Sequence, residues 1–92
     1  MLDAILSGCR VLDLTQNVAG PFCTQTLGDL GAEVIKIERP GSGDDARQWK
    51  PPEVAGVSTG FAALNRNKKS VCIDLDSAAG QQLVARLAAG TD

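Results

Sequence analysis

Three short apolar runs alternate with more polar segments along the chain. They occupy residues 10–14 (RVLDL), 33–37 (EVIKI) and 70–75 (SVCIDL), and glycine or polar residues bound each of them. Short runs rich in branched apolar residues predict β-strands. A strand, a helix and a second strand within about thirty residues predict a βαβ unit, in which the strands are parallel and the crossover is right-handed. The pattern therefore predicts an α/β fold with a parallel sheet and flanking helices.

Helical spacing follows the first run and returns after the third. Gly20-Pro21 is a suitable helix start, because proline is tolerated at the first helical position. The apolar stripe of this helix is expected to contain Cys23, Leu27 and Leu30, and the helix is expected to end at Gly31. The last helix is expected to have Ser77 as its N-cap and to stop at Gly90. Its apolar face comprises Leu83, Val84, Leu87 and Ala88.

Residues 41–57 are rich in glycine, proline and charge, and they predict a long loop followed by a helical turn at residues 61–64. Loops of this length are usually functional or disordered. The alternation of strand and helix stops where a fourth strand would begin, and two helices can scarcely cover both faces of a parallel sheet. We therefore expect residues 1–92 to be an incomplete N-terminal portion of a domain. The alternative is a small domain that finishes on a helix.

Composition narrows the possible functions. The chain is 43% hydrophobic and 22% charged, which is typical of a folded globular protein, and its net charge of −2 gives no support for nucleic-acid binding. The N-terminus lacks the features of a signal peptide or membrane span, and three distant cysteines fit a reducing compartment, so a cytoplasmic location is expected. Histidine is absent, which excludes a Ser-His-Asp triad or a His-bound metal within these residues.

Ligands of open parallel sheets bind beyond the carboxyl ends of the strands. Three loops qualify, at residues 15–21, 38–57 and 74–77. The first leads into a helix N-terminus, which favours an anionic group. Its sequence lacks the G-x-G-x-x-G pattern of dinucleotide-binding loops, and Pro21 has no N–H to donate. A site-forming loop and a plain connection are equally supported there.

Glu38 and Arg39 follow the second predicted strand. Glu38 lies 18 residues after Gly20, a spacing at which Rossmann domains place the acid that binds a ribose hydroxyl. Arg39 offers a planar guanidinium suited to phosphate. Composition alone favours a simpler interpretation, an exposed ion pair before a turn.

Two further clusters are chemically suggestive. Arg66, Lys68 and Lys69 could meet a polyphosphate, but a run of like charges more often lines a solvated face. Asp44 and Asp45 could bind a metal or act as a general base. Adjacent acids without a third ligand nearby are more often solvated, so we expect no metal site.

Three stretches, taken in order, resemble the N-terminal region of the class III CoA-transferases. They are RVLDLT at residues 10–15, AGPFCTQTLGDLGAEVIKIERPGSGDD at residues 19–45 and LNRNKKSVCIDL at residues 64–75. This family includes formyl-CoA, carnitine and glutarate CoA-transferases and the related α-methylacyl-CoA racemases. The resemblance covers residues 8–92, and the long segment at residues 41–64 is more typical of a transferase than of a racemase.

The resemblance implies that the chain is the first part of a Rossmann-like large domain in a two-domain enzyme that forms an interlocked homodimer. It implies the transfer of CoA from an acyl-CoA donor to a free carboxylic acid through a covalent aspartyl intermediate. In the family the nucleophilic aspartate lies beyond the position of Asp92, so no catalytic residue is expected here and these residues alone should be inactive. Coenzyme A and acyl-CoA are substrates, and no tightly bound cofactor, nucleic acid or membrane is implied. A racemase or a non-catalytic nucleotide-binding module are the alternatives.

The resemblance also implies CoA contacts. Val18 and Ala19 match loop positions that line the CoA cleft, and Arg39 matches an arginine that meets the nucleotide end of CoA. The strand end that contacts the adenosine part corresponds to Ile73, Asp74, Leu75 and Asp76. Many relatives carry lysine in place of Asp76, and an acid there would repel phosphate. Some carry glutamine in place of Val18, and valine has no side-chain hydrogen-bond donor.

Overall fold

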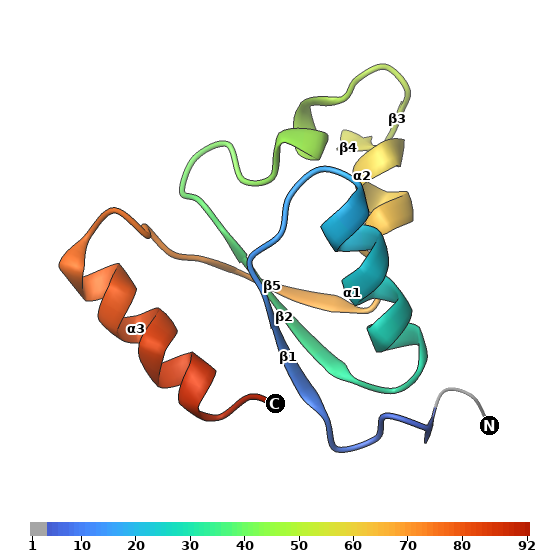
Figure 1. The fold of residues 1–92 in the computed structure, drawn as a ribbon. Coiled ribbons are helices and arrows are strands. Elements are labelled where there is room, and N and C mark those ends of the chain that lie inside the picture. The colour runs from blue at the N-terminus through green and yellow to red at the C-terminus, as the bar shows by residue number, and fades with distance from the viewer. Residues whose placement is uncertain (1–3) are drawn as a thin grey trace.

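A computed structural model describes residues 4–92 (Figure 1). The first half consists of β1 (Arg10–Asp13), α1 (Ala19–Asp29), β2 (Glu33–Glu38) and a short 3-10 helix, η2 (Asp45–Gln48). The second half consists of β3 (Glu53–Val54), β4 (Val57–Ser58), α2 (Thr59–Leu64), β5 (Lys68–Cys72) and α3 (Ala78–Ala89). No helix within residues 4–92 is long and apolar enough to cross a membrane.

The main sheet has three parallel strands with β2 in the centre, between β1 and β5. This arrangement confirms the predicted α/β class and the predicted parallel pairing. The third strand starts and ends earlier than predicted, at Lys68 and Cys72. The strand begins with Lys68 and Lys69, and two consecutive charged residues do not indicate a strand, so the sequence did not predict this start. The N–H of Ile73 still donates to the carbonyl of Glu38 at 2.9 Å, just beyond the strand end.

The segment at residues 41–57 is more ordered than its composition predicts. It contains η2 and the antiparallel pair β3–β4, in which each strand has two residues. Strands that short leave no alternating pattern in the sequence. The helical turn expected at residues 61–64 is confirmed as part of α2.

Strand register places alternate residues on opposite faces of the sheet. In Figure 1, α1 and α2 lie on one side of the sheet and α3 lies on the other. Val34 belongs to the α1 side, where its side chain lies next to Gly28 of the helix. The same face carries charged residues that are almost completely buried, namely Asp13, Lys36 and Glu38.

Helix α1 buries a face different from the predicted apolar stripe. Its buried residues are Pro21, Thr24 and Gln25, whereas Cys23 is exposed and Leu27 and Leu30 are half-buried. The inner face is polar because the sheet beneath it is polar. The hydroxyl of Thr24 donates to Asp13 at 2.8 Å, and the side-chain oxygen of Gln25 accepts from the N–H of Arg66 at 2.9 Å.

The predicted ends of α3 are confirmed. The Ser77 hydroxyl accepts from the N–H of Gly80 at 2.9 Å, and Gly90 is the C-cap. Its predicted apolar face is only partly covered, since Leu83 and Ala88 are exposed while Val84 and Leu87 are half-buried. After α3 the chain returns to the free edge of β1, where the N–H of Asp92 donates to the carbonyl of Arg10 at 2.9 Å.

Candidate functional site

The carboxyl edge of the sheet gathers the loops that follow β1, β2 and β5. Arg39, directly after β2, and the residue before it contact the two neighbouring segments. The Nη2 of Arg39 donates to the side-chain oxygen of Gln16, in the first loop, at 2.9 Å. The residue before it, Glu38, accepts through its carbonyl from the N–H of Ile73, at the start of the third loop. Arg39 therefore lies between the two other candidate segments, as expected for the central strand.

The Arg39 guanidinium is held by its surroundings but is still open to solvent. Its Nε donates to the carbonyl of Gly43 at 2.8 Å, and its Nη2 also pairs with the carboxylate of Asp45. The side chain is 45% exposed. These bonds use Nε–H and both N–H groups of Nη2, so the two N–H groups of Nη1 are the donors that a phosphate could meet.

A pocket of about 220 Å³ adjoins this group at the ends of β2 and β5. It is lined by Glu38, Arg39, Gly41, Ser42, Gly43, Arg47, Ser70 and Cys72. Gly43 is required at this place, because its φ is +66° and an added Cβ would come within 2.7 Å of the Glu38 carboxylate. The backbone at Gly43 therefore packs directly against the Glu38 carboxylate at the base of the pocket.

Val18 and Ala19 are exposed where the first loop enters α1. Val18 takes the N-cap position without a side-chain cap, and its carbonyl accepts from the N–H of Phe22 at 2.8 Å. An added Cβ on Gly20 would lie 2.2 Å from Cβ of Thr15. Glycine at position 20 thus lets the loop fold tightly over Thr15 and leaves Val18 and Ala19 on the surface.

The third candidate segment splits between interior and surface. Ile73 is 4% exposed and belongs to the small core. Asp74, Leu75 and Asp76 are exposed, and the Asp74 carboxylate accepts from the N–H of Asp76 at 3.0 Å. The three surface residues extend the same edge as Arg39, and CoA contact at all of these positions stays a prediction.

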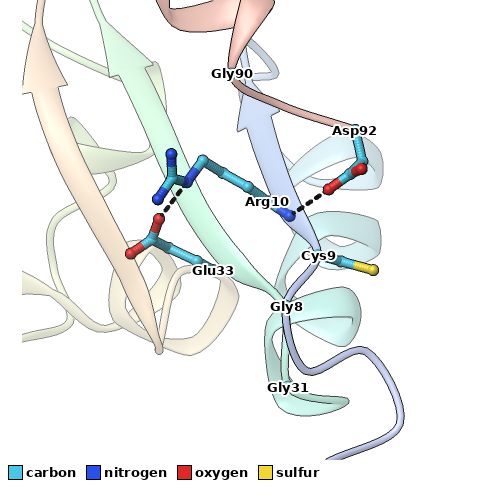
Figure 2. A pocket seen from close by; sticks show the side chains of 7 residues that line it. All are labelled: Gly8, Cys9, Arg10, Gly31, Glu33, Gly90 and Asp92. Atoms are coloured by element: carbon cyan, nitrogen blue, oxygen red, sulfur yellow. Dashed lines mark hydrogen bonds and ion pairs between the residues drawn. The ribbon is translucent and has the colours of Figure 1, made fainter.

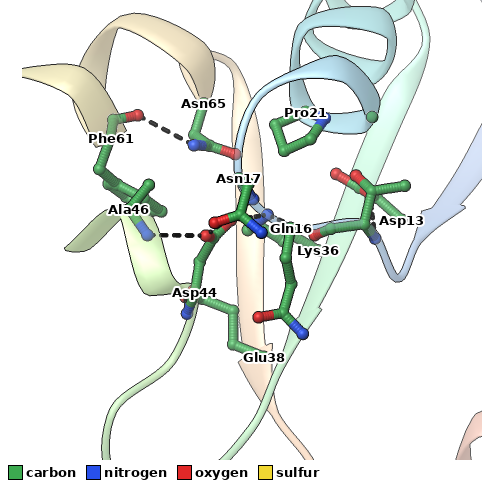
Figure 3. A network of polar contacts seen from close by, with 12 residues as sticks. Asp13, Gln16, Asn17, Pro21, Lys36, Glu38, Asp44, Ala46, Phe61 and Asn65 are labelled. Atoms are coloured by element: carbon green, nitrogen blue, oxygen red, sulfur yellow. Dashed lines mark hydrogen bonds and ion pairs between the residues drawn. The ribbon is translucent and has the colours of Figure 1, made fainter. Parts of the chain in front are cut away.

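A buried ion pair lies beneath the first two loops (Figure 3). Lys36 Nζ is 2.8 Å from Asp44 Oδ2, and the two side chains are 1% and 0% exposed. Lys36 also donates to the carbonyl of Thr15 at 2.9 Å. Burial alone would raise the pKa of Asp44, but hydrogen bonds from Lys36 and from the N–H groups of Ala46 and Asn17 hold that pKa below its ordinary value.

A second buried ion pair joins Lys68 of β5 to Asp13 of β1. Their atoms are 2.9 Å apart and their side chains are 2% and 0% exposed. Lys68 also donates to the carbonyl of Pro21 at 3.1 Å and to the side-chain oxygen of Asn65 at 2.9 Å. Burial lowers the pKa of Lys68, although Asp13 opposes that shift. Through the bonds to Pro21 and Thr24, this pair connects the sheet to the first turns of α1.

Glu38 is buried and belongs to a third ion pair, with Arg47, so the interpretation of Glu38 and Arg39 as an exposed ion pair is wrong. Its carboxylate accepts two hydrogen bonds from Arg47, at 2.6 and 2.7 Å, one from the N–H of Asp44 at 2.9 Å and one from the Ser70 hydroxyl. The bonds from Arg47 lower the pKa of Glu38 to about 2, against the effect of burial. Arg47 in turn lies over the Phe61 ring, 3.9 Å from its centroid.

The two acids at positions 44 and 45 have different environments. The expectation that both are solvated is wrong for Asp44, which is buried because Lys36 and two backbone N–H groups compensate its charge. Asp45 is exposed and pairs with Arg39. Among residues 4–92, no group of three or more histidine, cysteine, aspartate or glutamate residues is arranged to hold a metal ion.

The basic cluster before β5 does not converge on one ligand. Arg66 pairs with Asp29 at 2.5 Å, and Lys69 pairs with Glu33 at 2.8 Å; both cations are exposed. Lys68 is instead buried against Asp13. A solvated face is therefore correct for Arg66 and Lys69 and wrong for Lys68.

Sequence reasoning missed the roles of Asp13, Lys36 and Asp44. A signal was present for the first two, since each interrupts a run of branched apolar residues that reads as a buried strand. A charge in such a place requires a buried partner. The partner's identity was not visible, because Asp13 and Lys68 are 55 positions apart along the chain.

A larger pocket, of about 410 Å³, lies at the amino ends of the strands (Figure 2). Its lining residues are Gly8, Cys9, Arg10, Gly31, Glu33, Gly90 and Asp92. Ligands of open parallel sheets bind at the opposite edge. Size therefore does not make this pocket the better candidate, and it contains none of the residues expected to contact CoA.

The parallel sheet, with helices on both sides and charged loops at its carboxyl edge, defines the structure as an α/β fold. Residues 6–92 match CoA-transferase family III, and the chain belongs to this family. It is 56% identical to succinyl-CoA:glutarate CoA-transferase of Mus musculus over 87 residues, which is 95% of this chain and 20% of that protein. It is 49% identical, over 95% of its length and 22% of the relative's, to succinyl-CoA–D-citramalate CoA-transferase of Chloroflexus aurantiacus.

Solved structures agree with the fold. A CAIB/BAIF family protein from Brucella suis has a TM-score of 0.88 and 46% identity, over 95% of this chain and 24% of that one. A hypothetical protein from Mycobacterium tuberculosis has a TM-score of 0.83 and 52% identity, over 94% and 23% respectively. The chain thus spans roughly a fifth to a quarter of the length of the relatives that it matches.

Proposed function

We propose that this chain is the N-terminal part of a CoA-transferase and supplies part of its CoA site. The complete enzyme would transfer CoA from an acyl-CoA donor to a free carboxylic acid through a covalent aspartyl intermediate. Family membership supports this proposal, as do the names of relatives that act with glutarate, D-citramalate and oxalate. The observation that carries it here is the position of Arg39, half-exposed at the end of the central strand.

In this proposal the guanidinium of Arg39 binds a phosphate at the nucleotide end of CoA. Val18 and Ala19 line the cleft on one side. The third loop lies on the other side with Asp74, Leu75 and Asp76, while Ile73 supports it from inside. Gln16 and Asp45 orient the guanidinium, so the phosphate would meet a preorganised donor.

The nucleophilic aspartate is proposed to lie outside these residues. The environments of four aspartates here support that division. Asp13 and Asp44 are buried in ion pairs, while Asp29 and Asp45 pair with arginines. A carboxylate neutralised by a fixed cation is a poor nucleophile for a thioester, because attack requires it to give up that partner.

The remaining features of the proposal concern the whole protein. CoA thioesters enter as substrates and no cofactor is tightly bound. Two chains form an interlocked homodimer that works in the cytoplasm, with acyl-CoA and carboxylic acids as its partners.

The proposal is tested on the protein as its own gene encodes it. Succinyl-CoA is offered as donor with glutarate, citramalate or oxalate as acceptor, and the new thioester is detected by chromatography and mass. Trapping with hydroxylamine or borohydride should reveal the covalent intermediate. Epimerisation of a 2-methylacyl-CoA without any transfer would replace the proposal with the racemase. Binding of CoA without either reaction would replace it with a binding module.

A further inference from the structure

The Lys36–Asp44 pair touches both loops that carry the proposed CoA contacts. On the side of the first loop, Lys36 donates to the carbonyl of Thr15, and Asp44 Oδ1 accepts from the N–H of Asn17 at 3.1 Å. Figure 3 shows the Asp44 carboxylate bonded to Ala46, with Asn17 of the first loop and Lys36 of β2 beside it. The pair therefore holds the chain one residue before Val18.

Asn17 needs this support for its backbone. Its φ is +72°, in the left-handed region that residues other than glycine rarely adopt. Such a conformation persists when its surroundings stabilise it. The hydrogen bond from the Asn17 N–H to the fully buried Asp44 carboxylate stabilises the left-handed conformation of Asn17. It thereby sets the direction in which the chain continues to Val18.

The same carboxylate organises the loop after β2. Asp44 Oδ1 also accepts from the N–H of Ala46 at 2.9 Å, which caps η2. The backbone N–H of Asp44 donates to Glu38 at 2.9 Å. Asp45, the first residue of η2, pairs with Arg39. One oxygen atom thus connects the turn before Val18 to the turn that orients Arg39.

We infer that Asp44, with Lys36 as its counter-ion, is a positioning residue for CoA binding. It fixes the distance between the Val18–Ala19 loop and the Arg39 guanidinium, and it touches no CoA atom itself. This inference rests on the proposed function. Stability alone does not explain the pair, because a buried ion pair is often no more stabilising than apolar residues of similar volume. A connection between two separate loops is what an apolar pair would lack.

The test compares two double variants of the protein as its own gene encodes it. Lys36→Met/Asp44→Asn and Lys36→Met/Asp44→Ala both remove the two charges, so neither leaves an unpaired buried ion. They differ in the amide group at position 44, whose oxygen can still accept from Asn17 and Ala46 and which alanine lacks. Binding of free CoA is measured by calorimetric titration, in which the stoichiometry reports the fraction of competent protein.

We expect the Asp44→Asn double variant to bind CoA within about threefold of the wild type. The Asp44→Ala double variant should bind about tenfold more weakly at unchanged stoichiometry, because the acceptor for the N–H groups of Asn17 and Ala46 is lost. The KM for the carboxylic acid acceptor should be equal in both. A merely structural role would lower the stoichiometry of the Asp44→Ala variant and leave its affinity unchanged.

Lys68→Met/Asp13→Asn is the matched control. It removes a pair that is equally buried on the same face of the sheet. This pair also holds the first loop, since Asp13 accepts from Thr15 and Lys68 donates to the carbonyl of Pro21, but it makes no bond to the loop after β2. Asparagine at position 13 can still accept from Thr15. The affinity of this control for CoA should stay within about twofold of the wild type. The inference would be overturned if the two Asp44 double variants bound CoA with equal affinity. It would also be overturned if the control bound CoA as weakly as the Asp44→Ala double variant. In both cases CoA binding by the wild type would leave the proposed function standing. Absence of CoA binding in the wild type would overturn the proposed function itself.

Discussion

Each of the two edges of the sheet carries an ion pair between a lysine and an acidic residue, and the two pairs have opposite environments. At the carboxyl edge, the side chains of Lys36 and Asp44 are 1% and 0% exposed. At the amino edge, Lys69 and Glu33 are 72% and 36% exposed, and Arg10 shares the same glutamate. Exposed pairs are screened by water and contribute little. Breaking a buried pair leaves a charge without water or partner and is costly.

The difference shows where this fold needs rigidity. The buried pairs lie under the loops that hold the proposed CoA contacts, whereas the exposed pairs border an open pocket without such residues. Arg39, though half-exposed, is oriented by Gln16, Gly43 and Asp45. The burial of its ion pairs, more than the number of its charges, distinguishes the carboxyl edge from the amino edge.

The largest effect is expected from Lys36→Met alone. It leaves the Asp44 carboxylate buried without its counter-ion, and the free energy of unfolding should fall by about 3–5 kcal/mol. Urea unfolding at neutral pH measures this loss. The Lys36→Met/Asp44→Asn double variant should regain much of it, because no buried charge remains. If Lys36→Met lowered the free energy of unfolding as little as Glu33→Gln at the amino edge, the contrast between the two edges would be wrong.

Glu38 should make the stability depend on acid. Its pKa is lowered from 4.5 to about 2 in the folded protein, so its contribution is fully present above about pH 4.5 and is lost as pH falls towards 2. A shift of this size corresponds to roughly 3 kcal/mol. Urea unfolding at a series of pH values should show a steep decline for the wild type in that window.

Glu38→Gln should flatten the decline, since the amide does not titrate. Glu53→Gln is the control, because Glu53 is an exposed glutamate of the β3–β4 hairpin, and this variant should keep the wild-type slope. An unchanged slope in Glu38→Gln would show that other carboxylates govern the acid sensitivity.

Arg39→Ala should raise the KM for CoA substrates by an amount equivalent to about 1–3 kcal/mol, the range for a hydrogen bond to a charged group. Steady-state kinetics of the whole protein with varied acyl-CoA measures it. Arg66→Ala is the matched control, since Arg66 is an exposed arginine that pairs with Asp29 away from the carboxyl edge, and it should leave the KM unchanged. An unaltered KM in Arg39→Ala would remove Arg39 from the site.

The smallest effect is expected from Glu33→Gln at the amino edge. Lys69 and Arg10 lower the pKa of Glu33, but all three side chains are open to water. Its urea midpoint and CoA affinity should both match the wild type within experimental error. A loss comparable to that of Lys36→Met would show that burial does not distinguish the two edges.

Local patterns were sufficient for much of the fold. Branched apolar runs identified all three strands of the sheet, and Ser77 and Gly90 marked the ends of α3. The strand-end rule placed Arg39 at the carboxyl edge. The β3–β4 hairpin was missed because two-residue strands have no readable period, and the inner face of α1 was assigned wrongly because a buried face was assumed to be apolar.

By itself, the sequence determined the order of strands and helices, the parallel pairing and the edge at which the loops gather, because these follow from short-range periodicity and chain connectivity. Only the tertiary structure decided which charges are buried and with which partners. Asp44 reads like its neighbour Asp45, yet one is enclosed beneath two loops and the other faces solvent. The reason is physical: the cost of a buried charge depends on groups brought near it by folding, and those groups are distant along the chain.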